Sequence, residues 1–303
     1  MKFSLCLPVE IPALANEFIT GEAVTKMARA AEAAGFAAVN VTDHPIPEDR
    51  WMAGGGHHAL DPLVVLTQAG AATTRLRLHT HIVVLGYRNP FLLAKGVMTL
   101  DRLSGGRVIL GVAAGYLRPE FRALGVDYDE RNELADEAIR AMKAAWTGES
   151  FRFEGLHFDA RGHTMLPRPV QEPHPPVWVG GNSKRAIRRA VDLGDGWVPF
   201  PNPDVHEKFV KTPALETLKE LGARIAYLRE YASSVGRKAP LDISFAPLSR
   251  TLGGRWEAGS LLRDVEELSK LGVGWMAIRL PGETLPELLG EIERFAGEVM
   301  SRV

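Results

Sequence analysis

The first residues that suggest chemistry lie at 40–45, NVTDHP, where an apolar run ends on an acid, a histidine and a proline. Imidazole titrates near neutral pH and can take a proton from a hydroxyl or return one, so His44 is a candidate acid–base residue. Adjacent residues of a strand point to opposite faces, so Asp43 need not be the group that orients His44. An ordinary loop after a buried strand would also explain the pair, and both interpretations stay open.

Further histidines follow as His57 and His58 and as His79 and His81. Residues two apart on a strand share a face, so HTH at 79–81 could offer two imidazoles to one metal ion, as in metal-dependent barrel hydrolases. The sequence has no cysteine cluster, HExxH motif or dense carboxylate set to complete four ligands. We therefore expect no catalytic metal, and histidines that face a polar interior are the simpler interpretation.

A third candidate is the segment VWVGGNSKRAIRRAVDLGDGW at 177–197, an apolar strand followed by two glycines and a basic helix. Gly180 and Gly181 permit close approach of the backbone, and the unpaired N–H groups and dipole of a helix starting near Ser183 favour an anion. A plain turn with Ser183 as the N-cap fits the spacing equally well. Because LGVAAG at 110–115 has the wrong glycine spacing and no P-loop occurs, Rossmann-type nicotinamide binding is not indicated.

Apolar runs and amphipathic segments alternate along the chain, which predicts repeated strand–helix units. The expected strands are FSLCLPV (3–9), AAVNVT (37–42), LRLHTHIVVL (76–85), RVILGV (107–112), PVWVGG (176–181), GWVPF (196–200), LDISFAP (241–247) and WMAIRL (275–280). The expected helices follow at 21–34, 61–73, 90–102, 130–146, 183–193, 213–235, 259–271 and 284–300. Eight such units predict an α/β fold, a (β/α)8 TIM barrel that forms a single domain over 1–303.

Three irregular stretches interrupt this rhythm. Residues 148–176 alternate aromatic and polar residues and are rich in proline, so we expect an insertion with short antiparallel strands between barrel strands 4 and 5. With the loops at 45–60 and 199–212, it is expected at or beside the carboxyl ends of the strands. Gly35, Gly194 and Gly272 each follow a helix and are predicted to end it in the left-handed conformation.

Composition excludes several other classes of protein. Lys and Arg number 36 against 37 Asp and Glu, so the net charge of -1 disfavours nucleic acid as a partner. No uncharged apolar run reaches 18 residues, so no membrane span is expected. The single cysteine, Cys6, lies in the first expected strand and cannot form an internal disulfide, which favours a cytoplasmic location.

Long strings of the sequence resemble the bacterial luciferase-like monooxygenase superfamily. They are GFAAVNVTDHP, LRLHTHIVVLGYRNPFLLAKGVMTLDRLSGGRVILGVAAGYLRPEFRALG and VWVGGNSKRAIRRAVDLGDGWVP, of which NPFLLAKGVMTLDRLSGGRVILGV is the most specific. The resemblance covers nearly the whole chain and is nearest to the flavin- or deazaflavin-dependent oxidoreductases. It implies a barrel with an insertion, usually a homodimer, and a cofactor whose phosphate lies on the glycine turn after the fifth barrel strand.

The resemblance also implies roles for individual residues. Asp43 and His44 match the acid–histidine pair that contacts the deazaflavin coenzyme F420, and the histidine serves as a base in some relatives. His81 and Ile82 match a bulge with a non-prolyl cis peptide that supports the deazaflavin ring. The matching phosphate-binding turn consists of Gly180, Gly181, Asn182 and Ser183.

One position departs from the family pattern. Tyr116 follows GVAAG where deazaflavin-dependent sugar-phosphate dehydrogenases carry a glutamate thought to act as the acid, which argues against that substrate. We count Tyr116 among the cofactor-contacting residues, where it could donate a proton or only flank the pocket. Glu120 lies nearby in sequence, but no role follows from sequence alone.

These inferences give one leading hypothesis and three alternatives. The leading one is an F420-dependent oxidoreductase that transfers a hydride between the deazaflavin and a small organic substrate, with His44 moving the proton. The main alternative is a monooxygenase that uses reduced FMN and oxygen. A metal-dependent barrel hydrolase and a cofactor-binding protein without turnover are less favoured.

Overall fold

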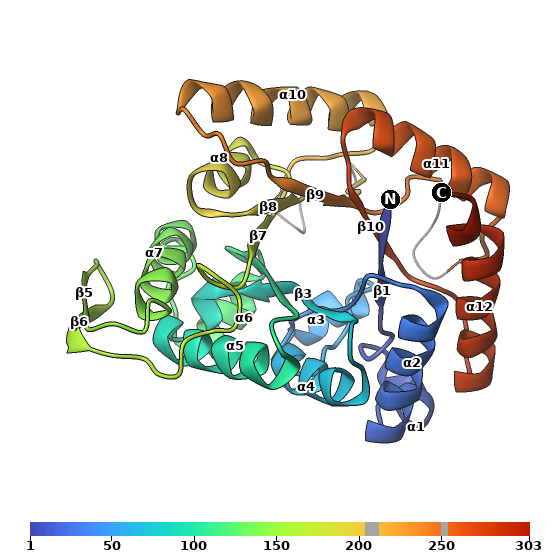
Figure 1. Ribbon diagram of the computed structural model, residues 1–303, viewed down its shortest axis with the longest axis horizontal. Helices are drawn as coiled ribbons and strands as arrows, with labels where there is room; N and C mark the ends of the chain where they lie inside the picture. The colour runs from blue at the N-terminus through green and yellow to red at the C-terminus, as the bar shows by residue number, and fades with distance from the viewer. Residues whose placement is uncertain (204–211, 250–253) are drawn as a thin grey trace.

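In a computed structural model, which describes residues 1–203, 212–249 and 254–303, eight parallel strands close into a barrel. Around the barrel the strands follow the order β1, β10, β9, β8, β7, β4, β3 and β2 (Figure 1). They are β1 (Lys2–Cys6), β2 (Ala38–Val41), β3 (Arg77–Val84), β4 (Val108–Ala113), β7 (Val177–Gly180), β8 (Gly196–Val198), β9 (Asp242–Phe245) and β10 (Trp275–Ile278). The predicted (β/α)8 barrel is confirmed.

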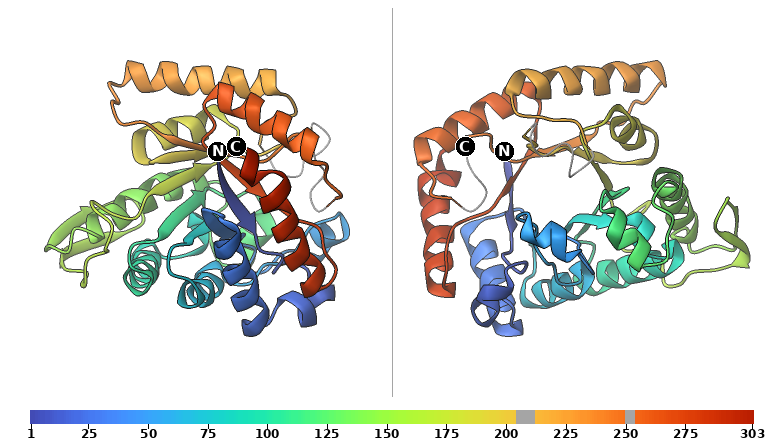
Figure 2. Two further views of the ribbon diagram at one scale, coloured as in Figure 1. Left: turned by 45° about the vertical axis from the view of Figure 1, so that its right-hand side comes forward. Right: turned by 180° about the vertical axis from the view of Figure 1, so that it is seen from behind.

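Helices surround the barrel on all sides (Figure 2). The longer ones are α2 (Gly21–Ala34), α4 (Pro62–Ala72), α5 (Pro90–Ser104), α7 (Arg131–Ala145), α8 (Lys184–Leu193), α10 (Leu218–Ser234), α11 (Ala258–Leu271) and α12 (Leu285–Glu298). Shorter elements are η1 (Pro12–Leu14), α1 (Ala15–Phe18), α3 (Asp49–Ala53), η2 (Leu85–Tyr87), α6 (Arg118–Ala123) and η4 (Met300–Arg302). None of the helices in these ranges combines the length and apolar character needed to cross a bilayer.

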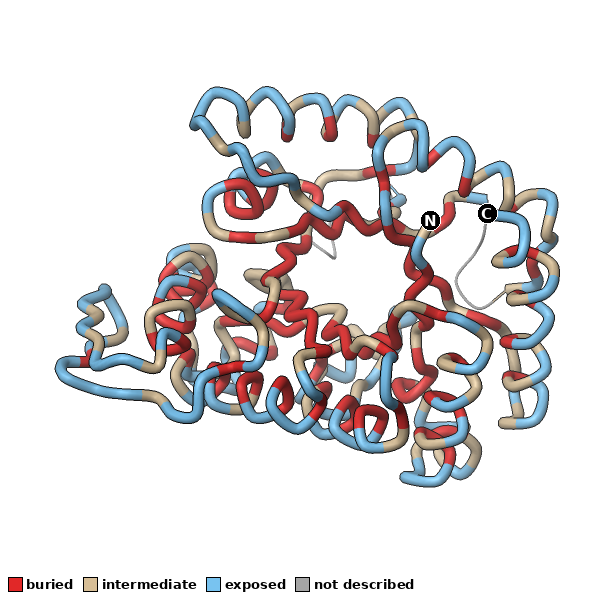
Figure 3. The backbone as a smooth tube through the Cα atoms, in the orientation of Figure 1, coloured by how far each residue is buried: buried red, intermediate tan, exposed pale blue. Residues whose placement is uncertain are grey.

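Burial follows from the sequence pattern. Strands such as β2 and β7 are buried at every position, because apolar residues in succession suit a parallel strand covered on both faces. Figure 3 shows these strands as a ring of buried backbone, while the helices alternate between buried inner and exposed outer faces. Helix α5 begins at Pro90, and the Asn89 side chain caps it by accepting bonds from Phe91 N and Leu92 N.

The insertion has the predicted form but not the predicted position. Its strands β5 (Phe151–Glu154) and β6 (Asp159–His163) pair antiparallel and lie beyond α7 in Figure 1. The connection then runs to the amino ends of the barrel strands, where Gln171 bonds the Val108 carbonyl at the start of β4. The expected carboxyl-end position was wrong because the insertion follows a helix, and the connection from a helix to the next strand lies at the opposite end of the barrel.

Two of the three predicted glycine caps are left-handed. Gly35 has φ of 91° and Gly272 has φ of 92°, whereas Gly194 is extended with φ of -108°. A Cβ on Gly194 would lie 3.0 Å from the Ala190 carbonyl oxygen and 3.1 Å from that of Val177. Glycine is needed at 194 for space and not for a positive φ, which corrects the prediction.

Candidate active site

A cavity of about 600 Å³ opens at the carboxyl ends of the barrel strands. Loops after several strands contribute to it, including 45–60, while 204–211 of the predicted loop at 199–212 lie outside the described residues. The predicted site residues that line it are Asp43, His44, His81, Ile82, Tyr116, Gly180, Gly181 and Ser183. The structure therefore brings together residues that are up to 140 positions apart in the chain. Asn182 is not among the lining residues.

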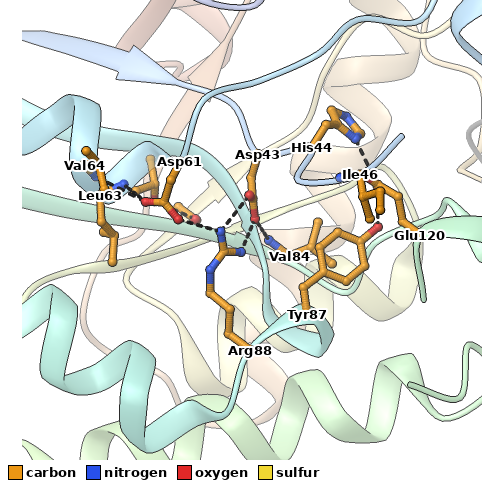
Figure 4. A network of polar contacts seen from close by, with 12 residues as sticks. Asp43, His44, Ile46, Asp61, Leu63, Val64, Val84, Tyr87, Arg88 and Glu120 are labelled. Carbon is orange, nitrogen blue, oxygen red and sulfur yellow. Dashed lines mark hydrogen bonds and ion pairs between the residues drawn. The ribbon is translucent and has the colours of Figure 1, made fainter. Parts of the chain in front are cut away.

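Glu120, and not Asp43, holds the imidazole of His44. Oε2 of Glu120 lies 3.1 Å from His44 Nδ1 and also accepts a 2.7 Å bond from the Tyr87 hydroxyl, while Oε1 accepts from Ile46 N at 3.2 Å (Figure 4). Glu120 lies in α6 with no exposed surface. Glu120 is close to Tyr116 in the sequence, but the sequence alone predicts no role for it, because only the fold brings α6 beside the end of β2.

The electrostatics of this group set the proton on His44. Burial raises the pKa of Glu120, but the hydrogen bonds from His44, Tyr87 and Ile46 outweigh it and lower that pKa below its ordinary value. An ionised carboxylate only accepts hydrogen bonds, so His44 Nδ1 is the donor and Nε2 is left for exchange. The hydroxyl of Tyr116 lies 3.4 Å from Nε2, and because burial raises the pKa of Tyr116 it stays a donor.

Asp43 has a different set of partners. Its carboxylate forms a two-pronged ion pair with Arg88, at 2.6 and 2.9 Å, and accepts a 3.1 Å bond from Val84 N at the end of β3 (Figure 4). Asp43 is 2% exposed, and Arg88 also bonds Asp61, the N-cap of α4. The side chain thus fixes the mouth of the barrel around His44, although it also lines the cavity.

The loop after β2 adds aromatic rings around His44. The rings of Trp51 and His57 have their centroids 4.7 and 4.9 Å from that of His44. Nδ1 of His57 lies 3.0 Å from the His58 carbonyl, so it carries the proton. Burial, with smaller contributions from the charges of His44 and Arg279, lowers the pKa of His57 to about 4. His57 is therefore uncharged at neutral pH.

The bulge implied for β3 is present. The register against β4 shifts between Thr80 and Val83, and the His81–Ile82 peptide bond is cis. Burial and the charge of Arg279 lower the pKa of His81 to about 4. His79 faces the barrel interior with no exposed surface, and the rings of His79 and His81 are 5.2 Å apart. Across the described ranges, no group of three or more His, Cys, Asp or Glu residues is placed to hold a metal ion.

The glycine turn after β7 has the expected backbone but a different use for Asn182. A Cβ on Gly180 would collide with Ile82, Gly181 has φ of 117°, and Ser183 caps α8 by accepting from Ala186 N at 3.1 Å. The Asn182 side-chain amide bonds the carbonyl and the N–H of Phe200 and the carbonyl of Pro213. Asn182 thus connects Phe200 with Pro213, and its contact with a cofactor stays a prediction.

An ion pair that the sequence interpretation missed lies on the opposite wall of the cavity. Arg279, directly after β10, pairs through Nη2 with Glu10, which follows β1. Glu10 is 3% exposed and Arg279 26% exposed, and both line the cavity. A charged residue at the carboxyl end of an apolar run is the signal that singled out Asp43, and it also marks these two positions.

Comparison with known proteins places this barrel in a family. The sequence model described as luciferase-like monooxygenase matches residues 1–251, and the chain belongs to this family of oxidoreductases. An uncharacterised protein of Mycobacterium tuberculosis is 30% identical over 298 residues, 91% of this chain and 94% of that protein. An FMNH2-dependent dimethylsulfone monooxygenase of Pseudomonas putida is 33% identical over 173 residues, 56% of this chain, and the match spans only 46% of that protein's length.

Solved structures share the fold at lower identity. A monooxygenase of Streptomyces bottropensis superposes with a TM-score of 0.79 at 22% identity, over 100% of this chain and 99% of that one. An F420-dependent secondary alcohol dehydrogenase, solved with an F420–acetone adduct, superposes with a TM-score of 0.76 at 16% identity, over 99% and 98% of the two chains. At these identities the likeness establishes the barrel alone.

Proposed function

We propose that this protein is an F420-dependent oxidoreductase that transfers a hydride between the deazaflavin and a small organic substrate. The observation that carries the proposal is the arrangement of Glu120, His44 and Tyr116 at the cavity. A hydride that joins or leaves a carbon bearing oxygen requires a proton to join or leave that oxygen. Nε2 of His44 is a group suited to that exchange.

The cavity suits a flavin-type cofactor. Its volume of about 600 Å³ lies in the usual range for sites of such ligands. Gly180 and Gly181 leave the turn without side chains, and the capped first turn of α8 offers N–H groups to a phosphate. The bound deazaflavin supplies the hydride chemistry, and the protein supplies binding, orientation and the proton.

His44 works in both directions of the reaction. Protonated, it donates from Nε2 to the oxygen of a carbonyl that is being reduced, and neutral, it accepts from a hydroxyl that is being oxidised. Glu120 keeps Nδ1 protonated in both directions and fixes the orientation of the ring. The rings of Trp51 and His57 cover His44, which is 7% exposed, and limit its contact with water.

The second candidate is a monooxygenase that uses reduced FMN and oxygen. It is favoured by the Pseudomonas putida relative, which is FMNH2-dependent. The glycine turn and the open end of the barrel would also accept the phosphate and ring of FMN, so binding separates the two candidates.

Equilibrium binding of F420 and FMN to the purified protein is the first measurement. We expect micromolar affinity for F420, much weaker binding of FMN, and F420-dependent turnover of a small hydroxy or oxo compound in a substrate screen. Tight binding of FMN with negligible binding of F420 would overturn the proposal in favour of the monooxygenase.

The role of His44 is tested by His44→Gln, with His58→Gln as the matched control because His58 is exposed and does not line the cavity. We expect His44→Gln to lose at least 100-fold in turnover with unchanged F420 affinity, since positioned proton transfer contributes roughly 10²- to 10⁴-fold. Full activity of His44→Gln would remove His44 from the mechanism.

A further inference from the structure

Arg279 occupies the side of the barrel mouth that faces the glycine turn. In the closed order of strands, β7 stands directly opposite β1, while β10 and β2 flank β1. The proposed phosphate site after β7 and the Glu10–Arg279 pair after β1 and β10 therefore lie at opposite walls of one cavity. His44, which follows β2, stands on the same side as Arg279.

The hydrogen-bonding capacity of Arg279 is only partly used. Its Nη2 meets Glu10, but Nε is buried without a hydrogen-bond partner among the described residues. A buried donor that lacks a partner costs free energy, and such groups in native structures often mark a missing ligand or water. About a quarter of the side chain is exposed, at the lining of the cavity.

Glu10 is buried beside this cation. Burial is the larger influence on Glu10 and raises its pKa, although the charge of Arg279 opposes the change. His57 and His81, on which the charge of Arg279 acts, are uncharged at neutral pH, since the pKa values of both are lowered to about 4. Arg279 is a permanently charged guanidinium that lines this wall, next to the carboxylate of Glu10.

The other two arginines that line the cavity are already satisfied. Arg189 bonds Asp136 at 2.5 Å and the Asn132 carbonyl at 2.9 Å. Arg131 donates to the Tyr128 carbonyl at 3.0 Å, with its guanidinium 3.9 Å from the centre of the Tyr128 ring. Arg131 projects from α7 and Arg189 from α8, on the side of the glycine turn.

We infer that Arg279, oriented by Glu10, is a specificity residue that binds a carboxylate on the substrate. This rests on the proposed function, because it assigns the reacting carbon to the space beside His44 and the carboxylate to the adjoining wall. A planar guanidinium at the cavity wall, partly exposed and with a donor left unpaired, matches the two oxygens of a carboxylate. The substrate class is then a small hydroxy acid or oxo acid, and not a neutral alcohol or ketone.

The test is binding of a carboxylate probe to the full chain without turnover. Carbon-13-labelled propionate is titrated by NMR in a buffer without phosphate, and its neutral isostere propionamide is titrated in parallel. We expect propionate to bind and propionamide not to bind. Arg279→Met should weaken propionate at least tenfold, while the matched control Arg131→Met should leave it unchanged.

A second variant should move affinity in the opposite direction. Glu10→Gln keeps an oxygen for Arg279 Nη2 but removes the competing negative charge, so propionate should bind more tightly. Equal propionate affinity in Arg279→Met and the unaltered protein would overturn the inference. So would a tenfold loss of F420 or FMN affinity in Arg279→Met with propionate unaffected, since the arginine would then serve the cofactor.

The two proposals fail separately. Absence of F420 turnover, with Arg279-dependent binding of propionate intact, would contradict the proposed function alone. Turnover of neutral alcohols that is indifferent to Arg279→Met would contradict the substrate assignment alone.

Discussion

Nδ1 of His44 lies 3.1 Å from Oε2 of Glu120, although the two residues are 76 positions apart in the sequence. Both side chains are buried, and Glu120 accepts further bonds from Tyr87 and Ile46. Two donors besides His44 therefore hold the carboxylate that orients the imidazole. Because Glu120 of α6 orients His44, Asp43, the acid next to His44 in sequence, is available to pair with Arg88.

The first prediction concerns Glu120→Gln. The amide can donate to Nδ1 as well as accept from it, so the tautomer of His44 is no longer fixed. We expect turnover to fall roughly 100-fold with little change in cofactor affinity, in the range that a mispositioned acid–base group costs. Steady-state kinetics across pH checks this, with the exposed Glu22→Gln of α2 as the control. An unchanged pH profile for Glu120→Gln would show that the carboxylate is only structural.

The second prediction concerns Asp43→Asn. The change leaves the partly buried Arg88 without its bidentate partner, and loss of one member of a buried pair typically costs about 3 kcal/mol of unfolding free energy or more. Urea unfolding at pH 7 measures it. Asp129→Asn, which breaks the exposed pair with Arg118, is the control and should change the midpoint little. A stable Asp43→Asn variant with lost cofactor affinity would instead support the direct contact that the resemblance implied.

Much of the fold was predictable because its signals are local. Apolar runs at parallel strands, amphipathic helices and their caps gave all eight strand–helix units and the insertion. The prediction of which end of the barrel the insertion occupies was wrong, because that end depends on whether the insertion follows a strand or a helix. Gly194 was misinterpreted because glycine is required both where a side chain has no space and where φ is positive, and the sequence does not distinguish the two cases.

The candidate site was predictable only in part. His44 and Gly181 stand out by residue type at strand ends, and His81 was identified through the family resemblance. Glu120 gains its role only when the barrel closes, whereas Arg279 carries the same signal as Asp43, a charged residue after an apolar run. The amide of Asn182 bonds the carbonyls of Phe200 and Pro213, and no local sequence pattern predicts these contacts. A homodimer stays a prediction from the resemblance.

The third prediction concerns Gly181→Ala. Gly181 has φ of 117°, where an L side chain is strained, and its Cβ would lie 3.1 Å from that of Ala186. A distorted turn would misdirect the N–H groups offered to phosphate, and we expect affinity for F420 or FMN to fall roughly tenfold, since a charge-assisted hydrogen bond contributes about 1.5–3 kcal/mol.

Fluorescence titration measures this effect, and Gly236→Ala is a matched control. Gly236 also has a positive φ, 71°, but is exposed with nothing within 4 Å of its Cβ position. Its replacement should lower stability by about 1 kcal/mol without altering cofactor affinity. Equal cofactor affinity in both variants would argue against a phosphate site at this turn.

The last prediction is a loss of stability in mild acid from His57 and His81. The pKa of each is lowered to about 4, whereas an imidazole in the unfolded chain titrates near 6.5. Between these values the unfolded chain binds protons that the folded chain does not, so stability is intact above pH 6.5 and falls until about pH 4. Each pKa unit corresponds to about 1.4 kcal/mol, so the combined loss should be on the order of a few kcal/mol.

Urea unfolding between pH 7 and 4.5 should show this slope, and His57→Gln and His81→Gln should each reduce it. If His57→Gln kept the same slope as His58→Gln, which removes the exposed imidazole next to it, the buried ring would not be the source.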